Sequence, residues 1–325
     1  MAREFPESDL QHVLEHTQSV WPRVAGSNIL ITGATGFVGS WLIETFLWAN
    51  RELKLGARVF ALSRNPETLR TGDSSLEILK GDVKSFRFPS APLHYIIHAA
   101  VEHGTTNLAG AQHVLEIAGA HGAPRILFTS SGAVYGQQPS TISHTPEDFA
   151  GTPLPDNPYA QGKRESERLL LDAGPNVVIA RLFAFVGPNL PLDKNFAVGN
   201  FVRDALRGGP ICIEGDGTPL RSYLYAADLA IWLWTLLVNG TPGRTYNVGS
   251  DQPISILELA RTVERICRVT GGISIAQSPV SGEPPKRYVP SIARARSELN
   301  VQPLVSLEDG IERMYAWYRY YTSTK

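Results

Sequence analysis

Short apolar runs alternate with amphipathic stretches over most of the chain, and this alternation predicts strands separated by helices. Each predicted strand is apolar almost throughout, and the strands lie at residues 28–33, 57–63, 76–83, 94–100, 125–131 and 176–183. Continuous apolar strands are typical of a parallel sheet that helices cover on both faces. The pattern therefore predicts an α/β chain with a doubly wound parallel sheet, in which residues 107–120 and 159–173 are two of the helices.

The regular alternation stops after Gly187, where stretches rich in proline and glycine alternate with short helices. This change predicts a smaller C-terminal α/β domain above the strand ends, which would hold the substrate. The strongly apolar segment that begins near Leu224 is predicted to return to the sheet. The larger domain would then comprise residues 28–188 and 224–250, and the smaller one residues 189–223 and 251–325.

Residues 1–27 precede the first strand and are predicted to form a helical extension. Ser8 is its expected N-cap, and Trp21 is the side chain expected to anchor it. Residues 12–16 match the H-x-x-E-H pattern of some zinc enzymes, which would place His12 and His16 on one helix face. Because no further ligand follows nearby in the sequence, we interpret this segment as a solvated helix face and predict no metal site.

The bulk composition argues against several classes of function. The 325 residues carry a formal net charge of −1, which does not suit a surface for nucleic acid or membrane. The N-terminus has no apolar signal segment, and the longest strongly apolar run, residues 229–238, is too short to span a bilayer. Cys212 and Cys267 show no pairing or metal spacing. We therefore expect a cytoplasmic protein without nucleic acid or membrane as a partner.

Three glycines spaced three apart, Gly33, Gly36 and Gly39, follow the first predicted strand and open the next helix. A helix N-terminus carries unpaired N–H groups and the positive end of the helix dipole, and both attract phosphate. Glycines at this place allow a tight turn, close approach of a pyrophosphate and close packing of the helix on the strand. This position between a strand and a helix indicates a dinucleotide-binding site rather than a structural turn.

The residues that end the second predicted strand bear on the choice of dinucleotide. An acidic residue there would bind the ribose 2′-hydroxyl of NAD, whereas this chain has Ser63 and Arg64. An arginine beside a hydroxyl suits the 2′-phosphate of NADP. The alternative is that Arg64 stacks on the adenine, which is compatible with either cofactor. We therefore predict NADP or NAD, with a preference for NADP.

A serine turn and a tyrosine–lysine pair follow the fifth predicted strand. Ser131 ends that strand, and Tyr159 and Lys163 are four residues apart, so they share one helix face. A nearby ammonium is expected to lower the pKa of the tyrosine towards the working pH. Together with Ser131, the pair can take a proton from a sugar hydroxyl while a hydride leaves its carbon. A chance pair on a surface helix is the alternative, and the order of glycine loop, serine turn and pair argues against it.

These motifs together resemble the extended short-chain dehydrogenase/reductase family, which includes sugar-nucleotide epimerases, dehydratases and ketoreductases. The resemblance covers about residue 28 to the C-terminus and implies a Rossmann-like fold, a nucleotide-diphosphate sugar as substrate, and catalysis by Ser131, Tyr159 and Lys163. The cofactor contacts that it implies are Gly33, Thr35, Gly36, Phe37, Val38, Gly39, Ser63, Arg64, Asp82, Val83, Ala99, Ala100, Tyr159, Lys163 and Phe183. The substrate contacts that it implies are Ser131, Asn200, Arg221 and Arg287.

The turn after Ser131 departs from several branches of this family. The 4,6-dehydratases carry an Asp-Glu pair directly after the active-site hydroxyl, where this chain has Gly132 and Ala133. Neither residue can act as an acid or a base, so ordinary 4,6-dehydration is not expected. The glutamate that resembling decarboxylases use in this turn is also missing, as is the cysteine of the 3,5-epimerase/reductases.

Two further departures concern the substrate. The family often has an asparagine after the residue at Phe183, and this chain has Ala184, which removes one expected contact. The loop at residues 101–106 is shorter than is usual above the sugar. The site would then be more open, or Glu102 and His103 would substitute for the missing contacts.

Three functions remain open from the sequence. The first is a nucleotide-sugar epimerase that oxidises C4 and reduces it again from the other face. The second is an NADPH-dependent 4-ketoreductase, which Ser63 and Arg64 favour, and the third is a non-catalytic dinucleotide sensor. The intact set of Ser131, Tyr159 and Lys163 argues against the sensor. The turn after Ser131 has no additional acid or base, and this turn and the resemblance over most of the chain favour the epimerase slightly over the reductase.

The resemblance also implies an assembly, because the helices around residues 107–118 and 159–171 resemble those that pair into a four-helix dimer interface in this family. Apolar residues at helical spacing support this expectation. They are Leu108, Ala111, Leu115 and Ala118 on the first helix and Leu169 and Leu170 on the second. We therefore predict a homodimer.

Overall fold

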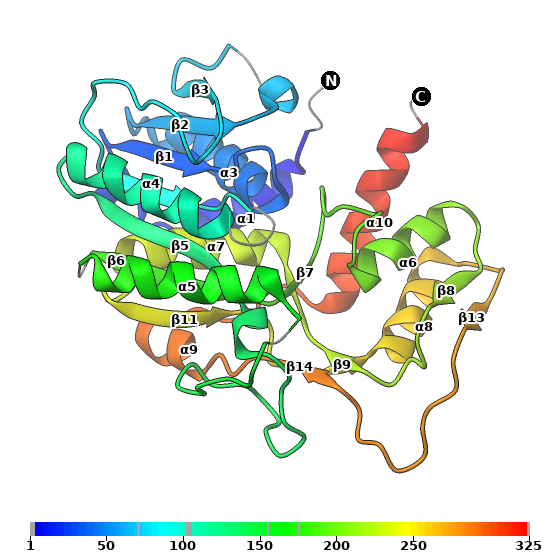
Figure 1. Cartoon of the computed structure of the whole chain (residues 1–325). Helices are drawn as coiled ribbons and strands as arrows, with labels where there is room; N and C mark the ends of the chain where they lie inside the picture. The colour runs from blue at the N-terminus through cyan, green and yellow to red at the C-terminus, as the bar shows by residue number, and fades with distance from the viewer. Residues whose placement is uncertain (1–3, 70–71, 102–105, 155, 175, 324–325) are drawn as a thin grey trace.

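The computed structural model describes residues 4–69, 72–101, 106–154, 156–174 and 176–323. Within these residues the largest element is a sheet of seven parallel strands in the order β11-β6-β5-β4-β1-β2-β3, which confirms the predicted doubly wound sheet (Figure 1). Its strands are β1 (Asn28–Thr32), β2 (Arg58–Ser63), β3 (Leu76–Lys80), β4 (Tyr95–His98), β5 (Arg125–Ser131), β6 (Val177–Leu182) and β11 (Arg244–Val248).

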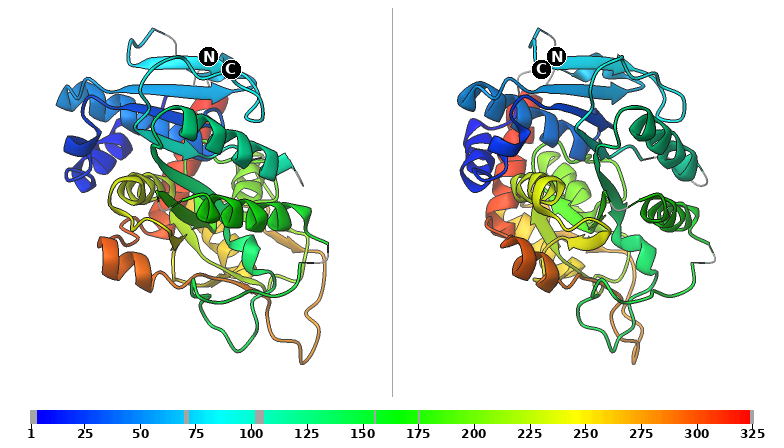
Figure 2. Two further views of the ribbon diagram at one scale, coloured as in Figure 1. Left: turned by 60° about the vertical axis from the view of Figure 1, so that its left-hand side comes forward. Right: turned by 90° about the vertical axis from the view of Figure 1, so that its left-hand side faces the viewer.

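Helices cover both faces of this sheet (Figure 2). One face carries α1 (Glu7–His16), α3 (Phe37–Leu53) and α7 (Ala226–Asn239), and the other carries α4 (Thr106–Ala120) and α5 (Pro158–Asp172). The longest strongly apolar run, residues 229–238, lies in α7, whose residues from Ala226 to Val238 are all buried. In the part of the chain that the structure describes, no helix is both long enough and apolar enough to cross a bilayer.

The order of the strands positions the site. From β1 the chain builds outwards through β2 to β3, and it then crosses back to β4 on the other side of β1. The loops that leave the carboxyl ends of β1 and β4 therefore diverge, which is where doubly wound sheets bind their ligands. The glycine loop follows β1, and the serine turn, η2 (Gly132–Tyr135), follows β5 at the same edge of the sheet.

The remaining elements gather beside the large sheet (Figure 1). A three-stranded sheet has the order β12-β9-β14, and β10 pairs with β7 and β13 with β8. Ser255 and Glu258 form a reciprocal capping box that starts α8. The elements are β7 (Ala184–Val186), α6 (Ala197–Leu206), β8 (Ile211–Ile213), β9 (Leu220–Arg221), β10 (Tyr223–Tyr225), β12 (Ile254–Ser255), α8 (Ile256–Cys267), β13 (Ile273–Ile275), β14 (Arg287–Tyr288), α9 (Ala293–Leu299) and α10 (Leu307–Ser323).

The N-terminal extension differs in detail from the prediction. α1 begins at Glu7 with Pro6 as its N-cap, so the prediction of Ser8 as N-cap is wrong. The carbonyl of Pro6 accepts hydrogen bonds from the N–H groups of Asp9 and Leu10, and its fixed φ suits a helix start. Trp21, in the short helix α2 (Trp21–Val24), is fully buried, as an anchor would be.

Buried carboxylates hold the extension in place. Asp9 accepts hydrogen bonds from Tyr225 at 2.5 Å and from Arg313 at 2.6 Å. Nε2 of His12 lies 3.1 Å from the buried carboxylate of Asp228. His12 therefore has a structural partner, and no group of three or more His, Cys, Asp or Glu side chains able to hold a metal is found among the described residues.

Some of the apolar side chains predicted to form a dimer interface are buried in the chain's own core instead. Ala111, Ala118 and Leu170 are buried in the cluster between the sheet and the helices α4 and α5. Leu115 and Leu169 are only partly buried at the edge of that cluster. Ala111, Ala118 and Leu170 are therefore not available to a partner, so the prediction that they lie in a dimer interface is wrong.

Candidate active site

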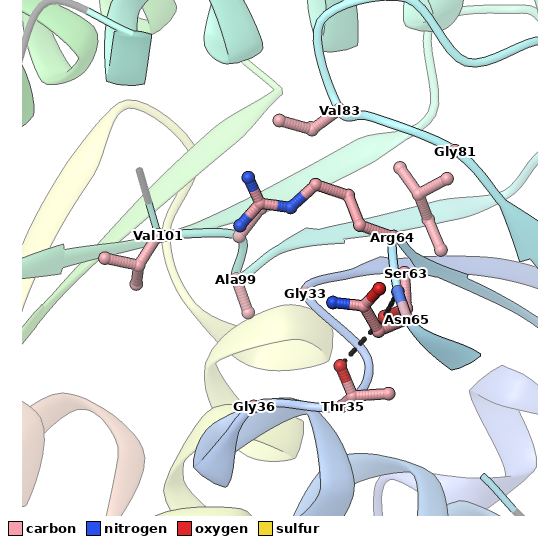
Figure 3. A pocket seen from close by; sticks show the side chains of 12 residues that line it. Gly33, Thr35, Gly36, Ser63, Arg64, Asn65, Gly81, Val83, Ala99 and Val101 are labelled. Atoms are coloured by element: carbon pink, nitrogen blue, oxygen red, sulfur yellow. Dashed lines mark hydrogen bonds between the residues drawn. The ribbon is translucent and has the colours of Figure 1, made fainter. Parts of the chain in front are cut away.

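The loops after β1, β2, β3 and β4 enclose one pocket (Figure 3). It brings together many of the residues that the sequence assigns to a dinucleotide, although they come from four separate loops of the chain. These are Gly33, Thr35, Gly36, Ser63, Arg64, Val83, Ala99 and Ala100. Glu102 and His103, which the sequence suggested as substitutes for missing sugar contacts, lie outside the described residues.

The glycine loop leaves room only for backbone. Gly33 has a φ of +71°, and a Cβ atom added there would lie 2.7 Å from the backbone of Ala100. A Cβ atom on Gly39 would lie 2.3 Å from the carbonyl oxygen of Gly33. Gly36 is the N-cap of α3, so the free N–H groups of that helix open at the pocket. This shape fits a dinucleotide whose pyrophosphate lies against the helix start.

The polar end of β2 is ordered by its own hydrogen bonds. The hydroxyl of Ser63 bonds that of Thr35 at 2.8 Å and accepts from the backbone N–H of Asn65 at 3.1 Å. The side chain of Arg64 is exposed and extends into the pocket (Figure 3). A cation therefore stands where an NAD-specific site would have a carboxylate.

Several predicted cofactor contacts lie behind the pocket or beside it. Val83 lines the pocket, whereas the carboxylate of Asp82 accepts from the N–H of Lys84 at 2.9 Å. Phe37 and Val38 begin α3 and pack into the core below the loop. These three side chains support the loops rather than face the pocket.

The three predicted catalytic side chains are brought together by β5 and α5. Ser131 is the last residue of β5, and its hydroxyl accepts from the N–H of Ala133 at 3.2 Å. Asn157 caps the start of α5 and so fixes where the helix begins. Tyr159, in the first turn, lies near the hydroxyl of Ser131. Lys163 is fully buried one turn later, and its Nζ donates to the carbonyl of Thr129 at 2.8 Å.

Burial dominates the charge state of this pair. Burial raises the pKa of the Tyr159 phenol, and the nearby hydroxyl of Ser131 acts in the opposite direction. The prediction that the pKa of Tyr159 is lowered by the lysine is therefore wrong for this structure. The ammonium of Lys163 is directed at Thr129 and lies 4.6 Å from the centre of the Phe128 ring.

Lys163 predicts an alkaline limit to activity. Burial lowers the pKa of its ammonium to about 8, although nearby Glu167 raises it. Because the mechanism that we propose requires a positive charge on the helix face that carries Tyr159, kcat/KM should fall as the pH rises through about 8. The free energy of unfolding should instead rise with pH, because between pH of about 8 and pH 10.5 the unfolded chain binds more protons than the folded chain.

The matched variant for this prediction is Lys163→Met, which removes the titrating group. Denaturant unfolding over the same pH range should show that the stability of the wild type rises relative to that of the variant. Wild-type activity that continues to rise well beyond pH 9, roughly one unit above the lysine's pKa, contradicts the prediction.

Tyr288 is a site residue that the sequence reasoning missed. Its hydroxyl donates to the carbonyl of Leu182 at 3.4 Å and lies near Ser131, and its ring centre lies 4.6 Å from that of Phe183. β14 pairs with β9 so that Tyr288 stands beside Arg221, whose guanidinium carbon lies 5.8 Å from the centre of the tyrosine ring. The only signal was its place directly after Arg287, a predicted substrate contact.

The predicted substrate contacts come from three elements. Arg221 and Arg287 lie on the paired strands β9 and β14, where Arg221 stands opposite Tyr288 and Arg287 opposite Leu220. Asn200 lies on α6, where its amide oxygen accepts from Arg203 at 3.3 Å. Arg221 is therefore the predicted substrate contact that lies beside Tyr288, whereas Asn200 lies on a separate helix.

A buried ion pair links α5 to the neighbouring strands β5 and β6. Glu167, one turn after Lys163, accepts from Arg181 of β6 at 2.7 Å and from the hydroxyl of Ser130. The guanidinium carbon of Arg181 lies 4.6 Å from the centre of the Tyr135 ring. The pair ties α5 to β5 and β6, and it holds Lys163 and the serine turn in register.

Comparison with known proteins agrees with this architecture. Residues 29–249 match the model of the NAD dependent epimerase/dehydratase family. UDP-glucuronic acid decarboxylase 1 of Arabidopsis thaliana is 31% identical over 310 residues, which cover 90% of this chain and 69% of that protein.

Two solved structures share the fold. An epimerase from Methanothermobacter thermautotrophicus superposes with a TM-score of 0.80 at 24% identity, covering 96% of this chain and 97% of that one. The UDP-glucose 4-epimerase of Thermotoga maritima, solved with UDP-glucose, superposes with a TM-score of 0.75 at 21% identity, covering 91% and 99%. With its family match, its sheet and its glycine loop, the chain belongs to the NAD-dependent epimerase/dehydratase family, a branch of the extended short-chain dehydrogenases/reductases.

Proposed function

We propose that the protein is an NAD(P)-dependent nucleotide-sugar epimerase that oxidises and re-reduces the sugar at C4. The observation that carries this proposal is the convergence of Ser131, at the end of β5, with Tyr159 and the buried Lys163 on α5, at the edge of the sheet that holds the dinucleotide pocket. Bound NAD(P) would accept the hydride and return it. Ser131 and Tyr159 would hold the sugar oxygen and carry its proton.

The substrate class is supported by the relatives and by the charges at the site. The relative from Arabidopsis is named for UDP-glucuronic acid, and the structure from Thermotoga contains UDP-glucose. Arg221 and Arg287 place two cations on the paired strands β9 and β14, one of them opposite Tyr288, and such groups suit the diphosphate of a nucleotide sugar. Asn200 would contact the same substrate from α6.

Two other reactions have a specific observation in their favour. The cation at Arg64 suits NADPH and thus a 4-ketoreductase, which uses the same catalytic residues. The curated relatives favour a decarboxylase. Ala133 argues against decarboxylation, because the glutamate expected from resembling decarboxylases is replaced by a methyl group.

The test combines the cofactor state of freshly purified protein with a panel of nucleotide sugars that includes UDP-glucose and UDP-glucuronic acid. An epimerase should retain its cofactor and give a product of unchanged mass with inverted C4, as seen by NMR. Consumption of added NADPH with a 4-keto sugar would instead indicate the reductase, and release of carbon dioxide would indicate the decarboxylase. Loss of water from any of these sugars would overturn the assignment.

Arg64→Ala tests the choice of cofactor. A charge-assisted hydrogen bond to phosphate is worth about 1.5–3 kcal/mol, so the Kd for NADP should rise by roughly tenfold or more. The Kd for NAD should hardly change, because it has no 2′-phosphate. Fluorescence titration with both cofactors measures this difference, and equal losses for the two would show that Arg64 stacks on adenine instead.

We also propose a homodimer through α4 and α5, with the partly exposed Leu108, Leu115 and Leu169 at its centre. Light scattering at micromolar concentration should give twice the mass of the chain. Leu115→Glu should shift the protein to monomers, because an unpaired carboxylate would be buried at the interface. A monomeric wild type at this concentration contradicts the proposal.

A further inference from the structure

Phe183 and Gly132 meet directly beside the proposed catalytic hydroxyl. Gly132 follows Ser131, and a Cβ atom added to it would lie 2.7 Å from Cζ of Phe183 and 2.8 Å from both Cε atoms. Such distances exclude a side chain at position 132 while the ring keeps its place. The φ of Gly132 is not positive, so a glycine is required at this position for space and not for backbone conformation.

The ring of Phe183 is held by its neighbours. A Cβ atom added to Gly249 would lie 3.2 Å from Cβ of Phe183, so the base of the side chain is tightly seated. The ring centre lies 4.6 Å from that of Tyr288 and 6.3 Å from that of Tyr135. Phe183 is only 9% exposed. The ring therefore cannot swing away from Gly132 without displacing Tyr288, whose hydroxyl donates to the carbonyl of Leu182.

We propose that Phe183 determines the reaction type of this site, because its ring occupies the volume that an acidic side chain next to Ser131 would need. The last step of this inference rests on the proposed function. Hydride transfer from C4 leaves a ketone, which makes the hydrogen on the neighbouring C5 acidic. A carboxylate at position 132 could take that proton and so lead towards elimination. With Phe183 over Gly132 the C5 hydrogen has no base at this place, and the hydride returns to C4.

A thermal double-mutant cycle tests the contact without any substrate. Gly132→Ala should lower Tm by roughly 3–8 °C, because overpacking of a core contact is destabilising. Phe183→Leu keeps an apolar side chain but removes the Cε and Cζ atoms that a Cβ at 132 would meet. In that background Gly132→Ala should change Tm by less than about 2 °C.

Gly215→Ala is the matched control, because an added Cβ there meets nothing within 4 Å and should leave Tm nearly unchanged. The proposal is overturned if Gly132→Ala has the same effect on Tm with phenylalanine and with leucine at position 183. Because this measurement uses no sugar, it stands even if the proposed function fails.

The effect on chemistry is tested with two double variants, Gly132→Asp with Phe183→Leu and Gly132→Asn with Phe183→Leu. Both are incubated with NAD(P) and the substrate in deuterated water, and mass spectrometry follows deuterium at C5. The aspartate should remove and return the C5 proton, so deuterium accumulates, whereas asparagine and the wild type should show none. Equal deuterium in the Asp and Asn variants would defeat the role of Phe183 in reaction type. If the wild type turns over no sugar at all, the proposed function has failed instead.

Discussion

Tyr159→Phe is expected to lower kcat/KM by roughly 10²–10⁴-fold, the range typical of a general acid–base group. The variant removes only the phenol oxygen, which lies near Ser131. The ring remains in the first turn of α5, so the helix and its cap at Asn157 are unchanged. The loss should therefore appear in the chemical step, which initial rates with a saturating nucleotide sugar will measure.

Cofactor binding separates this catalytic role from a structural one. Tyr159→Phe should bind NAD(P) with nearly the Kd of the wild type, because the glycine loop and the end of β2 are untouched. Tyr320→Phe is the matched control, since this tyrosine is 65% exposed on α10, and its activity should not change. Turnover within about threefold of wild type in Tyr159→Phe would refute the proposed mechanism.

Much of the fold was predictable because its signals are local. Strands such as β5 and β6 are continuous apolar runs that only a covered parallel sheet can bury. The glycine loop and the pair formed by Tyr159 and Lys163 depend on spacing within one turn or one helix, which the sequence shows directly. The pocket then follows from the rule that parallel strands share one carboxyl edge.

The parts that could not be predicted depend on pairings between distant segments. Tyr288 reaches Ser131 only because the two-residue strand β14 pairs with β9, and neither strand is long enough to have a pattern. The ring of Phe183 over Gly132 is a matter of side-chain packing, which periodicity does not describe. The raised pKa of Tyr159 reflects burial of the phenol, and burial of one atom is not visible from spacing.

One buried feature did leave a signal in the sequence. Arg181 is a charged residue inside the apolar run of β6, and Glu167 stands one turn after the catalytic lysine. A charge in a buried strand requires a partner, so the pair could have been proposed from the sequence. Its side chains are only 16% and 5% exposed, which makes it the best-shielded Arg–Glu pair among those found in the described residues.

Glu167→Gln is therefore expected to destabilise the protein by about 3–5 kcal/mol, because it leaves the buried Arg181 without its counter-charge. Tm should fall by about 10 °C. Loss of the carboxylate should also lower the pKa of Lys163, which Glu167 raises, so the alkaline fall in activity should move to lower pH.

The matched control is Asp172→Asn on the same helix. Asp172 pairs with Arg168 at 3.6 Å, but the two side chains are 72% and 86% exposed, so this ion pair should contribute less than about 1 kcal/mol to stability. Equal Tm values for the two variants in thermal unfolding would show that the buried pair does not hold α5 to the sheet.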